Sequence, residues 1–522
     1  MTARLKFASR LTAASAIVVV SIALGGLAGC GGSSGSDAPA PLSGENINLV
    51  FVLSPDLTYA ASGDVNPVTA NLTNQGLNRS LKMASFLKTQ VLGNQNVTGI
   101  YAVAPMTHLQ TASNLPDMAS LGAIQHFAML NQITLPAGAA QATNSFPINV
   151  SYAAGMVLPA GVAGPYAALL PCPACQGLDF GNSGGNNDAL VARIVTAKTT
   201  GFHVFSAPWE TTSAMLTNIN KLYGSSLSMP SGYAGPNQVY AVAITPSGSA
   251  SLVTYNSHLT PATTAPVLPA ALPLTTCAAQ PHKFSFSIKG GEPYSQTIDG
   301  VTTTGTTNAV LPTGINTNQT IYMIRHAEAH PTSSFDDGNF IAAGQWRALG
   351  LADALRGKIS PDMVMSIDPA QVAGIPKNPN LYSYVRTDMT VEPYAIANNL
   401  PFYLVASFSL MDVDYTDYPA NLLNSQSVIN ATNYFFIGDN YSNKKILLAW
   451  EHAHLPLTLN DLFSRYFPGG VGGPSLSSTP WPSADYDTIW TVKLDAQGNL
   501  TADNALCEGI DSARLPTDAP QF

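Results

Sequence analysis

Charged residues are scarce in this chain, and basic residues are the scarcer kind. Asp, Glu, Lys and Arg make up 10% of the 522 residues, and 31 acidic against 22 basic residues leave a net charge of −9. The sequence contains no basic run, so a nucleic-acid partner is not expected. Hydrophobic residues make up 46% of the chain, and its length allows two or more domains with full cores.

Long apolar runs are confined to the N-terminus. Arg4, Lys6 and Arg10 precede the apolar segment 11–27, and Leu-Ala-Gly leads from it to Cys30. A charged start, an apolar centre and a small-residue processing site are typical of an export signal, which is not part of the fold. The pattern resembles a bacterial lipoprotein signal, which implies lipidation of Cys30. A plain signal peptide or an anchor helix is the alternative.

We therefore expect residues 1–30 to be a signal and residues 31–43 to be a flexible linker, since they are rich in Gly, Ser, Ala and Pro. Gly31 follows the cysteine where Asp would be the other common residue. By the same resemblance this implies the outer membrane, facing the periplasm or the cell surface. The membrane contact would be the lipid on Cys30, with no spanning helix left after processing.

Cysteine is rare as well. Beyond Cys30 the chain has Cys172, Cys175, Cys277 and Cys507. Four cysteines in an oxidising compartment predict two disulfides, for which three pairings exist. We favour Cys172 with Cys175, as a loop staple, and Cys277 with Cys507. A two-residue spacing also occurs in redox and zinc sites, but no second ligand pair and no strand-then-helix context supports either. No metal and no cofactor are expected.

The most informative stretch is 320–328, an apolar run that ends in Arg325 and His326. Its apolar part has the length and β-propensity of a buried strand. A second apolar run, 446–450, leads to His452. The carboxyl ends of strands in an open α/β sheet meet at one edge, where ligands bind. The two histidines beside a fixed positive charge therefore indicate phosphoryl chemistry through a histidine nucleophile.

The chain also repeats its pattern of elements. A strand at 48–53 precedes a helix at 72–87, as the strand before His326 precedes a helix at 340–355, and each half ends in a predicted hairpin. So long a period indicates duplicated domains rather than a solenoid. Strands alternating with helices predict two α/β domains, each a mainly parallel sheet with helices on both faces and a terminal β-hairpin. We place these domains at residues 44–265 and 266–522.

The second half resembles the histidine phosphatase superfamily, which has the phosphoglycerate-mutase-like fold. Five motifs carry the resemblance in family order: Arg325 to Glu328, the helix of Gly344, the strand end 363–369, Arg386 with Thr390, and 450–452. The resemblance extends more weakly to the first half, which makes the chain a tandem with a degenerate first copy. In that copy Ser54 and Pro55 stand where Arg and His are expected. It would serve packing, substrate shaping or the binding of a protein partner.

A transferring phosphoryl group carries negative charge on three oxygens and needs fixed cations around it. Arg325 and Arg386 are predicted to clamp the phosphate, with His452 as a further donor. Glu328 is expected to orient other groups or to face the substrate. His326 must be unprotonated on its attacking nitrogen, so its other nitrogen is expected to be held by a backbone carbonyl.

The leaving oxygen needs a proton from a carboxylic acid. Asp412 and Asp414 are equal candidates, because the one-domain branch of the family places its acid in this segment, and Glu451 ranks below them. Two other acidic residues, Asp336 and Asp337, are predicted to be solvated loop residues. His454 is predicted to be a rim residue.

The resemblance implies a lipid-anchored, extracytoplasmic phosphatase. It would hydrolyse a small phosphomonoester through a phosphohistidine on His326, without a metal. A non-catalytic lipoprotein that keeps the fold and binds phosphate or another ligand is the alternative. The intact motifs of the second half, against the erased motifs of the first, favour the enzyme.

Overall fold

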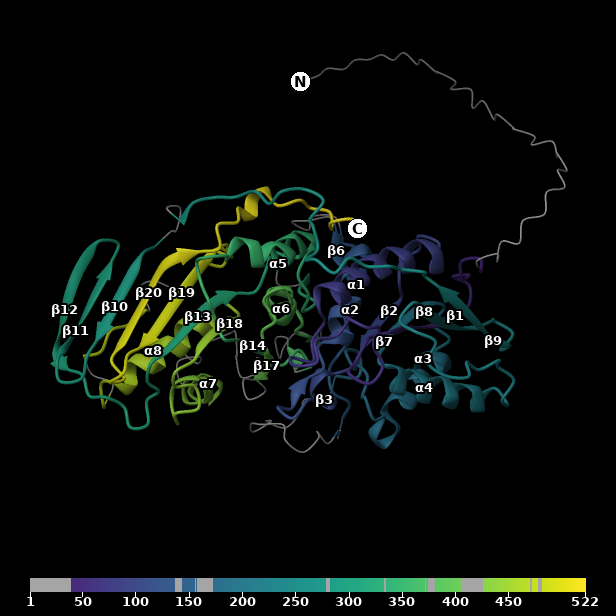
Figure 1. Cartoon of the computed structure of the whole chain (residues 1–522), viewed down its shortest axis with the longest axis horizontal. Helices are drawn as coiled ribbons and strands as arrows, with labels where there is room; N and C mark the ends of the chain where they lie inside the picture. Colours follow the sequence, from purple (N-terminus) through teal and green to yellow (C-terminus); the bar gives the residue numbers. More distant parts are fainter. Residues whose placement is uncertain are drawn as a thin grey trace, which may run out of the picture. The chain divides into compact units, whose positions relative to one another are not determined.

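A mixed five-stranded sheet forms the centre of the first half (Figure 1). The computed structural model describes residues 39–136, 143–154, 156, 172–277, 282–332, 335–370, 372–373, 381–405, 426–469, 472–476 and 481–522. Within these residues the strand order is β2-β7-β1-β8-β9. The bounds are β1 (Ile47–Leu53), β2 (Gly99–Ala102), β7 (Gly201–Ala207), β8 (Gln238–Ile244) and β9 (Ala250–Asn256). β2, β7 and β1 are parallel, and β8 and β9 form the predicted hairpin.

The second half contains a larger mixed sheet, with the order β12-β11-β10-β20-β19-β13-β18-β14-β17 in the described chain. The bounds are β10 (Phe284–Ile288), β11 (Pro293–Ile298), β12 (Val301–Asn308), β13 (Gln319–Arg325), β14 (Met363–Ile367), β17 (Phe402–Val405), β18 (Lys445–Trp450), β19 (Thr488–Leu494) and β20 (Leu500–Cys507). Only β13, β18, β14 and β17 run parallel. The expectation of a mainly parallel sheet is therefore wrong for this half.

The two sheets share a central strand order. The series β14-β18-β13-β19-β20 has the same connectivity and directions as β2-β7-β1-β8-β9. The second sheet adds β17 at one edge and the antiparallel strands β10, β11 and β12 at the other. The predicted correspondence of elements between the halves is found in the structure. A common origin of the halves by duplication stays a prediction, as do the domain boundaries.

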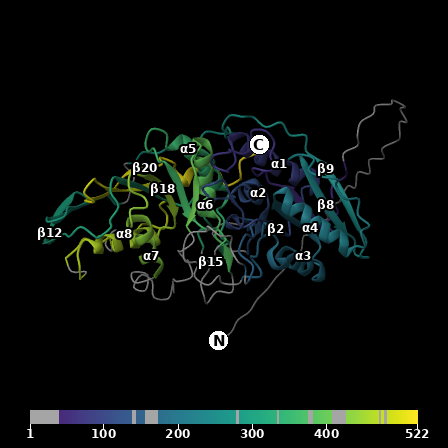
Figure 2. The same cartoon turned by 60° about the horizontal axis from the view of Figure 1, so that its bottom comes forward.

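Helices cover both faces of each sheet (Figure 1 and Figure 2). The bounds are α1 (Asn74–Phe86), α2 (Ala119–Leu130), α3 (Asn186–Thr196), α4 (Trp209–Leu222), α5 (Ala342–Ala354), α6 (Arg386–Asn398), α7 (Gln426–Phe436) and α8 (His454–Arg465). Three short antiparallel strand pairs lie outside the two sheets: β3 (Leu109–Gln110) with β4 (Leu115–Pro116), β5 (Gln132–Thr134) with β6 (Thr143–Ser145), and β15 (Val372–Ala373) with β16 (Tyr382–Ser383).

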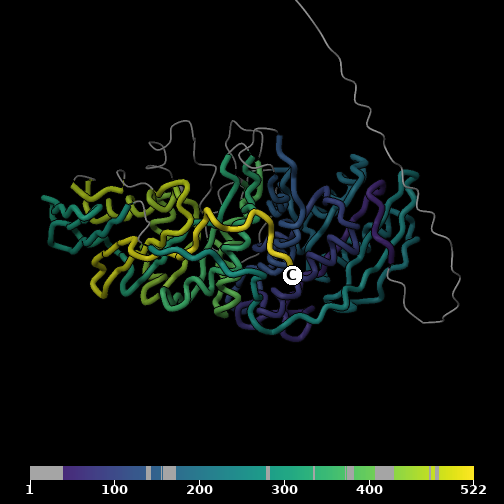
Figure 3. Tube along the Cα trace, turned by 90° about the horizontal axis from the view of Figure 1, so that it is seen from above, coloured from purple at the N-terminus to yellow at the C-terminus, as the bar shows by residue number. Residues whose placement is uncertain are grey.

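One apolar core joins the two halves. It contains Val50 of β1, Leu121 of α2, Val391 of α6 and Leu447 of β18, all fully buried. Separate cores form where α3 and α4 cover the first sheet and where α7 and α8 cover the second. The C-terminal end returns to the first half (Figure 3), where the carbonyl of Phe522 accepts a hydrogen bond from Ser85. Residues 39–522 accordingly form one compact unit.

Each pair of cysteines lies at bonding distance. Cys172 is bonded to Cys175 and Cys277 to Cys507, with Cα–Cα distances of 5.4 Å in both pairs. These are the pairings that the sequence analysis favours. Cys30 and the signal segment lie outside the described residues, so lipid attachment stays a prediction. In the part of the chain that is described, no helix has the length and apolar character to cross a membrane.

Candidate active site

The two central sequence motifs meet at the carboxyl edge of the second sheet. β13 and β18 are parallel neighbours, and Arg325 lies opposite Trp450 in their register. The backbone N–H of His326 donates to the carbonyl of Trp450 at 3.0 Å, so the pairing continues one residue beyond the strand. The predicted placement of both motifs at one sheet edge is confirmed.

His326 is buried, and its ring is oriented by its own loop. Nδ1 lies 2.7 Å from the carbonyl oxygen of Ala327 and donates to it. Burial lowers the pKa of His326 well below its usual value, and the guanidinium groups of Arg386 and Arg325 lower it further. The ring is therefore neutral, and the lone pair on Nε2 is available for attack. The expected backbone partner of the second nitrogen is confirmed.

Arg325 is the last residue of β13 and lies against an aromatic ring. Its guanidinium carbon is 3.9 Å from the centre of the Tyr486 ring. Nη1 donates to the carbonyl of Ser483. The buried Nε–H has no protein partner among the described residues. A buried donor without a partner is costly unless a ligand or water accepts from it, so this N–H can bind an anion.

Arg386 begins α6 and has the same kind of surroundings. Its guanidinium carbon lies 4.3 Å from the centre of the Tyr384 ring. Nη1 and Nη2 donate to the two carboxylate oxygens of Asp336, the second at 2.9 Å. Its Nε–H, like that of Arg325, finds no partner in the described chain. Each arginine is therefore fixed by a ring and an acceptor, with Nε–H left for a ligand.

Asp336 is not the solvated loop residue that the sequence predicts. Burial would raise its pKa, but the ion pair with Arg386 outweighs that effect and holds the pKa below its usual value. Its neighbour Asp337 is also enclosed, and burial raises the pKa of Asp337 to about 8. Both predictions were wrong because the loop is covered by the first half of the chain.

Thr390 connects the helix of one clamp to the loop of the nucleophile. It lies one turn after Arg386, on the same face of α6. Its hydroxyl donates to the carbonyl of Arg386 at 2.7 Å and accepts from the backbone N–H of Ala327 at 2.7 Å. The four-residue spacing seen in the sequence is therefore the spacing that lets one hydroxyl bridge α6 and the His326 loop.

His452 follows β18 and is the most accessible member of the cluster, with 28% of its side chain exposed. Burial lowers its pKa to about 4, and Arg325 and Arg386 act in the same direction, although Glu451 opposes them. His452 in turn lowers the pKa of His326. The four side chains predicted to bind and attack the phosphoryl group thus lie together in one cluster.

Glu451 is placed as a helix cap rather than as a proton donor. Its carboxylate accepts from the backbone N–H groups of Ala453 at 2.8 Å and His454 at 2.6 Å, and it also pairs with the His454 ring. Burial would raise its pKa, but His454 and His452 lower it below its usual value. An ionised carboxylate cannot donate a proton. His454 itself is buried, so its prediction as a rim residue is wrong.

The two favoured acid candidates, Asp412 and Asp414, lie outside the described residues.

Glu328 forms its ion pair with Arg347 of α5. Both of its carboxylate oxygens accept from Arg347, at 2.7 to 3.1 Å. Arg347 is fully buried in α5 and also donates to Glu508 at 2.5 Å. The charge of Glu328 is therefore neutralised by an ion pair within the protein, and its role, to orient other groups or to face the substrate, stays a prediction.

The matching edge of the first sheet has a different character. The Ser54 hydroxyl lies 2.8 Å from the Ser120 hydroxyl, and the His108 ring pairs with Asp117 at 2.8 Å. Asp117, Asp56 and Glu210 all interact electrostatically with His108. A group of ionised carboxylates repels a phosphate. That this half performs no phosphoryl chemistry stays a prediction.

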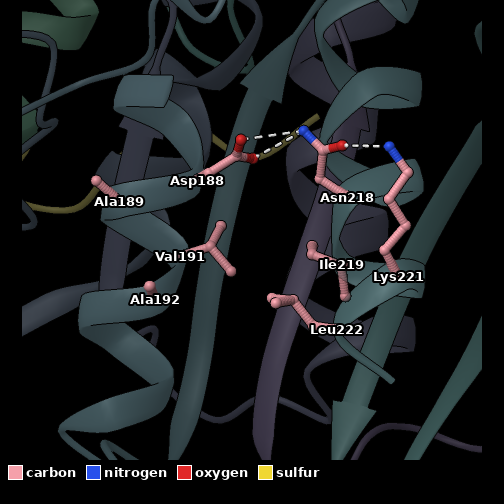
Figure 4. A pocket seen from close by; sticks show the side chains of 8 residues that line it. All are labelled: Asp188, Ala189, Val191, Ala192, Asn218, Ile219, Lys221 and Leu222. Atoms are coloured by element: carbon pink, nitrogen blue, oxygen red, sulfur yellow. Dashed lines mark hydrogen bonds between the residues drawn. The ribbon is translucent and has the colours of Figure 1, made fainter. Parts of the chain in front are cut away.

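A pocket of about 420 Å³ lies between α3 and α4, and it shares no residue with the His326 cluster (Figure 4). Asp188 accepts two hydrogen bonds from the Asn218 amide across it, and Val191, Ile219 and Leu222 supply apolar walls. Within the described residues, no group of three His, Cys, Asp or Glu side chains is placed to hold a metal ion.

Comparison with protein-family models and with curated proteins found no match. Solved structures give partial similarities. A structure described as an α-ribazole-5′-P phosphatase from Escherichia coli is 13% identical, with a TM-score of 0.25, over 37% of this chain and 98% of that one. A phosphoserine phosphatase from Entamoeba histolytica is 13% identical, with a TM-score of 0.23, over 36% and 96%.

A mycobacterial glucosyl-3-phosphoglycerate phosphatase is 12% identical, with a TM-score of 0.22, over 34% of this chain and 93% of the other. All three are described as phosphatases, and each likeness covers about a third of this chain. At TM-scores of 0.22 to 0.25 these likenesses do not establish membership of a family.

Proposed function

We propose that this protein is a phosphatase that hydrolyses a phosphomonoester through a phosphohistidine on His326. The observation that carries the proposal is the neutral His326 ring, held by the Ala327 carbonyl beside the guanidinium groups of Arg325 and Arg386. The Nε–H groups of Arg325 and Arg386, which have no partner among the described residues, supply buried donors for a phosphoryl group.

The reaction has two steps. Nε2 of His326 attacks phosphorus, the bond from phosphorus to the ester oxygen breaks, and the leaving oxygen takes a proton from a carboxylic acid. Water then attacks the phosphohistidine and gives a proton to the carboxylate left by the first step. The P–N bond breaks, and inorganic phosphate leaves while the neutral ring returns. Arg325, Arg386 and His452 stabilise charge on the phosphoryl oxygens in both steps. Asp412 and Asp414 remain the proposed acids, since Glu451 is held ionised.

We further propose that the enzyme acts outside the cytoplasm, bound to the envelope through a lipid on Cys30. The N-terminal sequence supports this placement, and the bonded Cys277 and Cys507 fit an oxidising compartment. Mass spectrometry of the mature N-terminus tests it, because a diacylglyceryl group on Cys30 is expected, and an unmodified residue there would contradict it.

The first prediction is that phosphate release depends on His326 and not on a metal. A screen of phosphomonoesters with the soluble protein, lacking the signal, should find substrates that the wild type hydrolyses. His326→Ala removes the attacking nitrogen and should abolish release, while a chelator should leave the wild type unchanged. Equal turnover by the two proteins would contradict the assignment. Glu292→Gln, an exposed change outside the cluster, serves as the control.

A non-catalytic anion-binding protein is the second candidate. The observation in its favour is that the buried Nε–H groups of Arg325 and Arg386 can bind an anion, while Glu451, the acid candidate that lies within the described residues, is held ionised. Binding of inorganic phosphate without turnover of any phosphomonoester in the screen would favour this candidate over the phosphatase.

A further inference from the structure

The position of Arg386 depends on the loop 335–340, here called the clamp loop. Asp336 of this loop binds Arg386 with both carboxylate oxygens. The loop also binds the backbone of α6, because the Arg386 N–H donates to the carbonyl of Gly338 at 3.0 Å. Gly338 has a φ of +80°, and a Cβ there would meet the Ser383 carbonyl oxygen at 1.8 Å. The clamp loop is thus tightly fitted against the start of α6.

Buried side chains of the first half bind the other side of the clamp loop. The Asn144 amide donates to the carbonyl of Phe335 at 2.9 Å and to Asp337 at 3.1 Å. The Ser145 hydroxyl donates to the carbonyl of Phe340 at 2.7 Å, and the Gln125 amide donates to Asn339 at 2.8 Å. These hydrogen bonds flank Asp336 on both sides in sequence.

The segment that precedes Arg386 is also bound by the first half. The Ser383 hydroxyl accepts from the backbone N–H groups of Val150 at 3.0 Å and Ser151 at 3.1 Å. Tyr384, whose ring lies against Arg386, is the next residue. Both segments that fix the guanidinium group are therefore attached to the half of the chain that lacks the Arg-His motif.

We propose that the first half positions the Arg386 clamp, and that Asn144 is the positioning residue through which it acts on the clamp loop. This inference rests on the proposed function, since it assigns Arg386 to phosphate binding. Asn144 sets the path of the loop, the loop sets the carboxylate of Asp336, and that carboxylate sets which guanidinium edge is left for phosphate. A buried amide with two acceptors has little freedom to move, so the constraint is specific.

The test measures the dissociation constant of inorganic phosphate by calorimetry with the whole soluble chain, which needs no turnover. Asn144→Ala removes both donors and should weaken phosphate binding about tenfold, because a small displacement of a clamp has a large effect. Asn218→Ala is the matched control, since that amide donates to Asp188 in the pocket between α3 and α4, which shares no residue with the His326 cluster. Its phosphate affinity should equal that of the wild type.

A double-mutant cycle separates positioning from a general loss of structure. In an Asp336→Asn background the ion pair between the loop and the guanidinium group of Arg386 is lost, so Asn144→Ala should change phosphate affinity less than twofold. Additive effects, or unchanged affinity in folded Asn144→Ala, would overturn the proposal. If Asn144→Ala does not fold, Ser145→Ala replaces it in the same cycle, with the same direction expected and a smaller effect.

The outcome for the proposed function is separate. Wild type that binds phosphate and shows the predicted coupling, yet hydrolyses no ester, would contradict the phosphatase and keep the positioning role. Wild type that does not bind phosphate at all would overturn both.

Discussion

Single residues in this site obtain their chemical state from their neighbours. His326 is neutral because it is buried beside two guanidinium groups, and its Nδ1 is held by a carbonyl, so Nε2 keeps its lone pair. Glu451 is charged instead of neutral, because two histidines and two backbone N–H groups keep its carboxylate ionised. The proposed nucleophile and the proposed proton donor are therefore different residues, and Glu451 is not suited to be the donor.

The lowered pKa of His326 predicts the acid limb of the pH profile. A group whose pKa is lowered loses its neutral form only when the pH falls below that lowered value. Wild-type kcat/KM should therefore not decline with an apparent pKa near 6.5 as the pH falls from about 7 to about 5. The profile should be corrected for the second ionisation of the phosphate ester, measured separately. An enzyme-derived acid limb near 6.5 would show that His326 titrates normally.

The sequence placed His326, Arg325, Arg386 and His452 together, because each ends, follows or begins a regular element that fixes its place at the sheet edge. It could not identify the ion partner of Arg386. Asp336 precedes it by 50 residues, and their meeting depends on tertiary contacts. Tyr384 and Tyr486 were missed for the same reason: a ring beside a guanidinium group has no fixed spacing in the sequence.

At the scale of elements, the two halves pack their first helix against the preceding loop in the same way. The first helix of each half has as its third residue a glycine that approaches the preceding loop. A Cβ at Gly76 would meet the Asp64 carbonyl at 2.2 Å, and one at Gly344 would meet the Glu328 carbonyl at 2.9 Å. One turn later, Arg79 pairs with Asp64 and Arg347 with Glu328. These matched letters were visible in the sequence, and their role is structural.

The strands of the second sheet show what pattern analysis finds and misses. The buried strand before His326 and both hairpins are confirmed. The antiparallel strands β10, β11 and β12 were missed, because β11 and β12 are largely polar and exposed and lack the alternation of a half-buried strand. The signal that could have found them is Asp299-Gly300, where both residues have positive φ in a tight hairpin turn.

The packing of α6 on α2 predicts a pH-dependent stability. Glu392 of α6 lies against Gly122 of α2, and burial raises its pKa to about 8, with Asp117 adding to the effect. A raised carboxyl pKa means that stability is fully present below the unfolded value of about 4.5 and is lost as the pH rises toward the folded value. Glu392→Gln should match the wild type near pH 4 and exceed it by roughly 3 kcal/mol at pH 7.

Chemical denaturation at several pH values measures this difference. The exposed substitution Glu292→Gln is the control and should show no such trend. A difference between Glu392→Gln and wild type that stays constant with pH would show that Glu392 titrates normally.

At the scale of the whole molecule, the two halves of the chain form one folded unit. They share a core through α1, α2, α5 and α6, and the C-terminal Phe522 packs back on the first half. The sequence predicted two domains because it repeats its elements, but it gave no sign of how much surface they share. When the other half of the chain buries a side chain, that burial cannot be recognised from the residue's neighbours in the sequence.

The disulfide between Cys277 and Cys507 predicts a loss of stability when it is removed. It closes a loop with a sequence separation of 230, and chain entropy gives such a loop on the order of 5 kcal/mol. Replacing both cysteines by serine should lower the thermal midpoint more than the same change at Cys172 and Cys175, which are three residues apart. Non-reducing peptide mapping checks the pairing, and a Cys277 peptide that is free or linked elsewhere would rule it out.

The most direct measurement is to trap the phosphorylated enzyme. Wild-type protein is mixed with a phosphomonoester that it hydrolyses. The reaction is quenched in base within one turnover, and the protein is mapped by mass spectrometry. The mechanism predicts one phosphoryl group on His326, stable in base and lost in acid, and none on His326→Ala. Phosphate release by a wild-type protein that never carries a phosphoryl group, or carries it on another residue, would contradict the central claim.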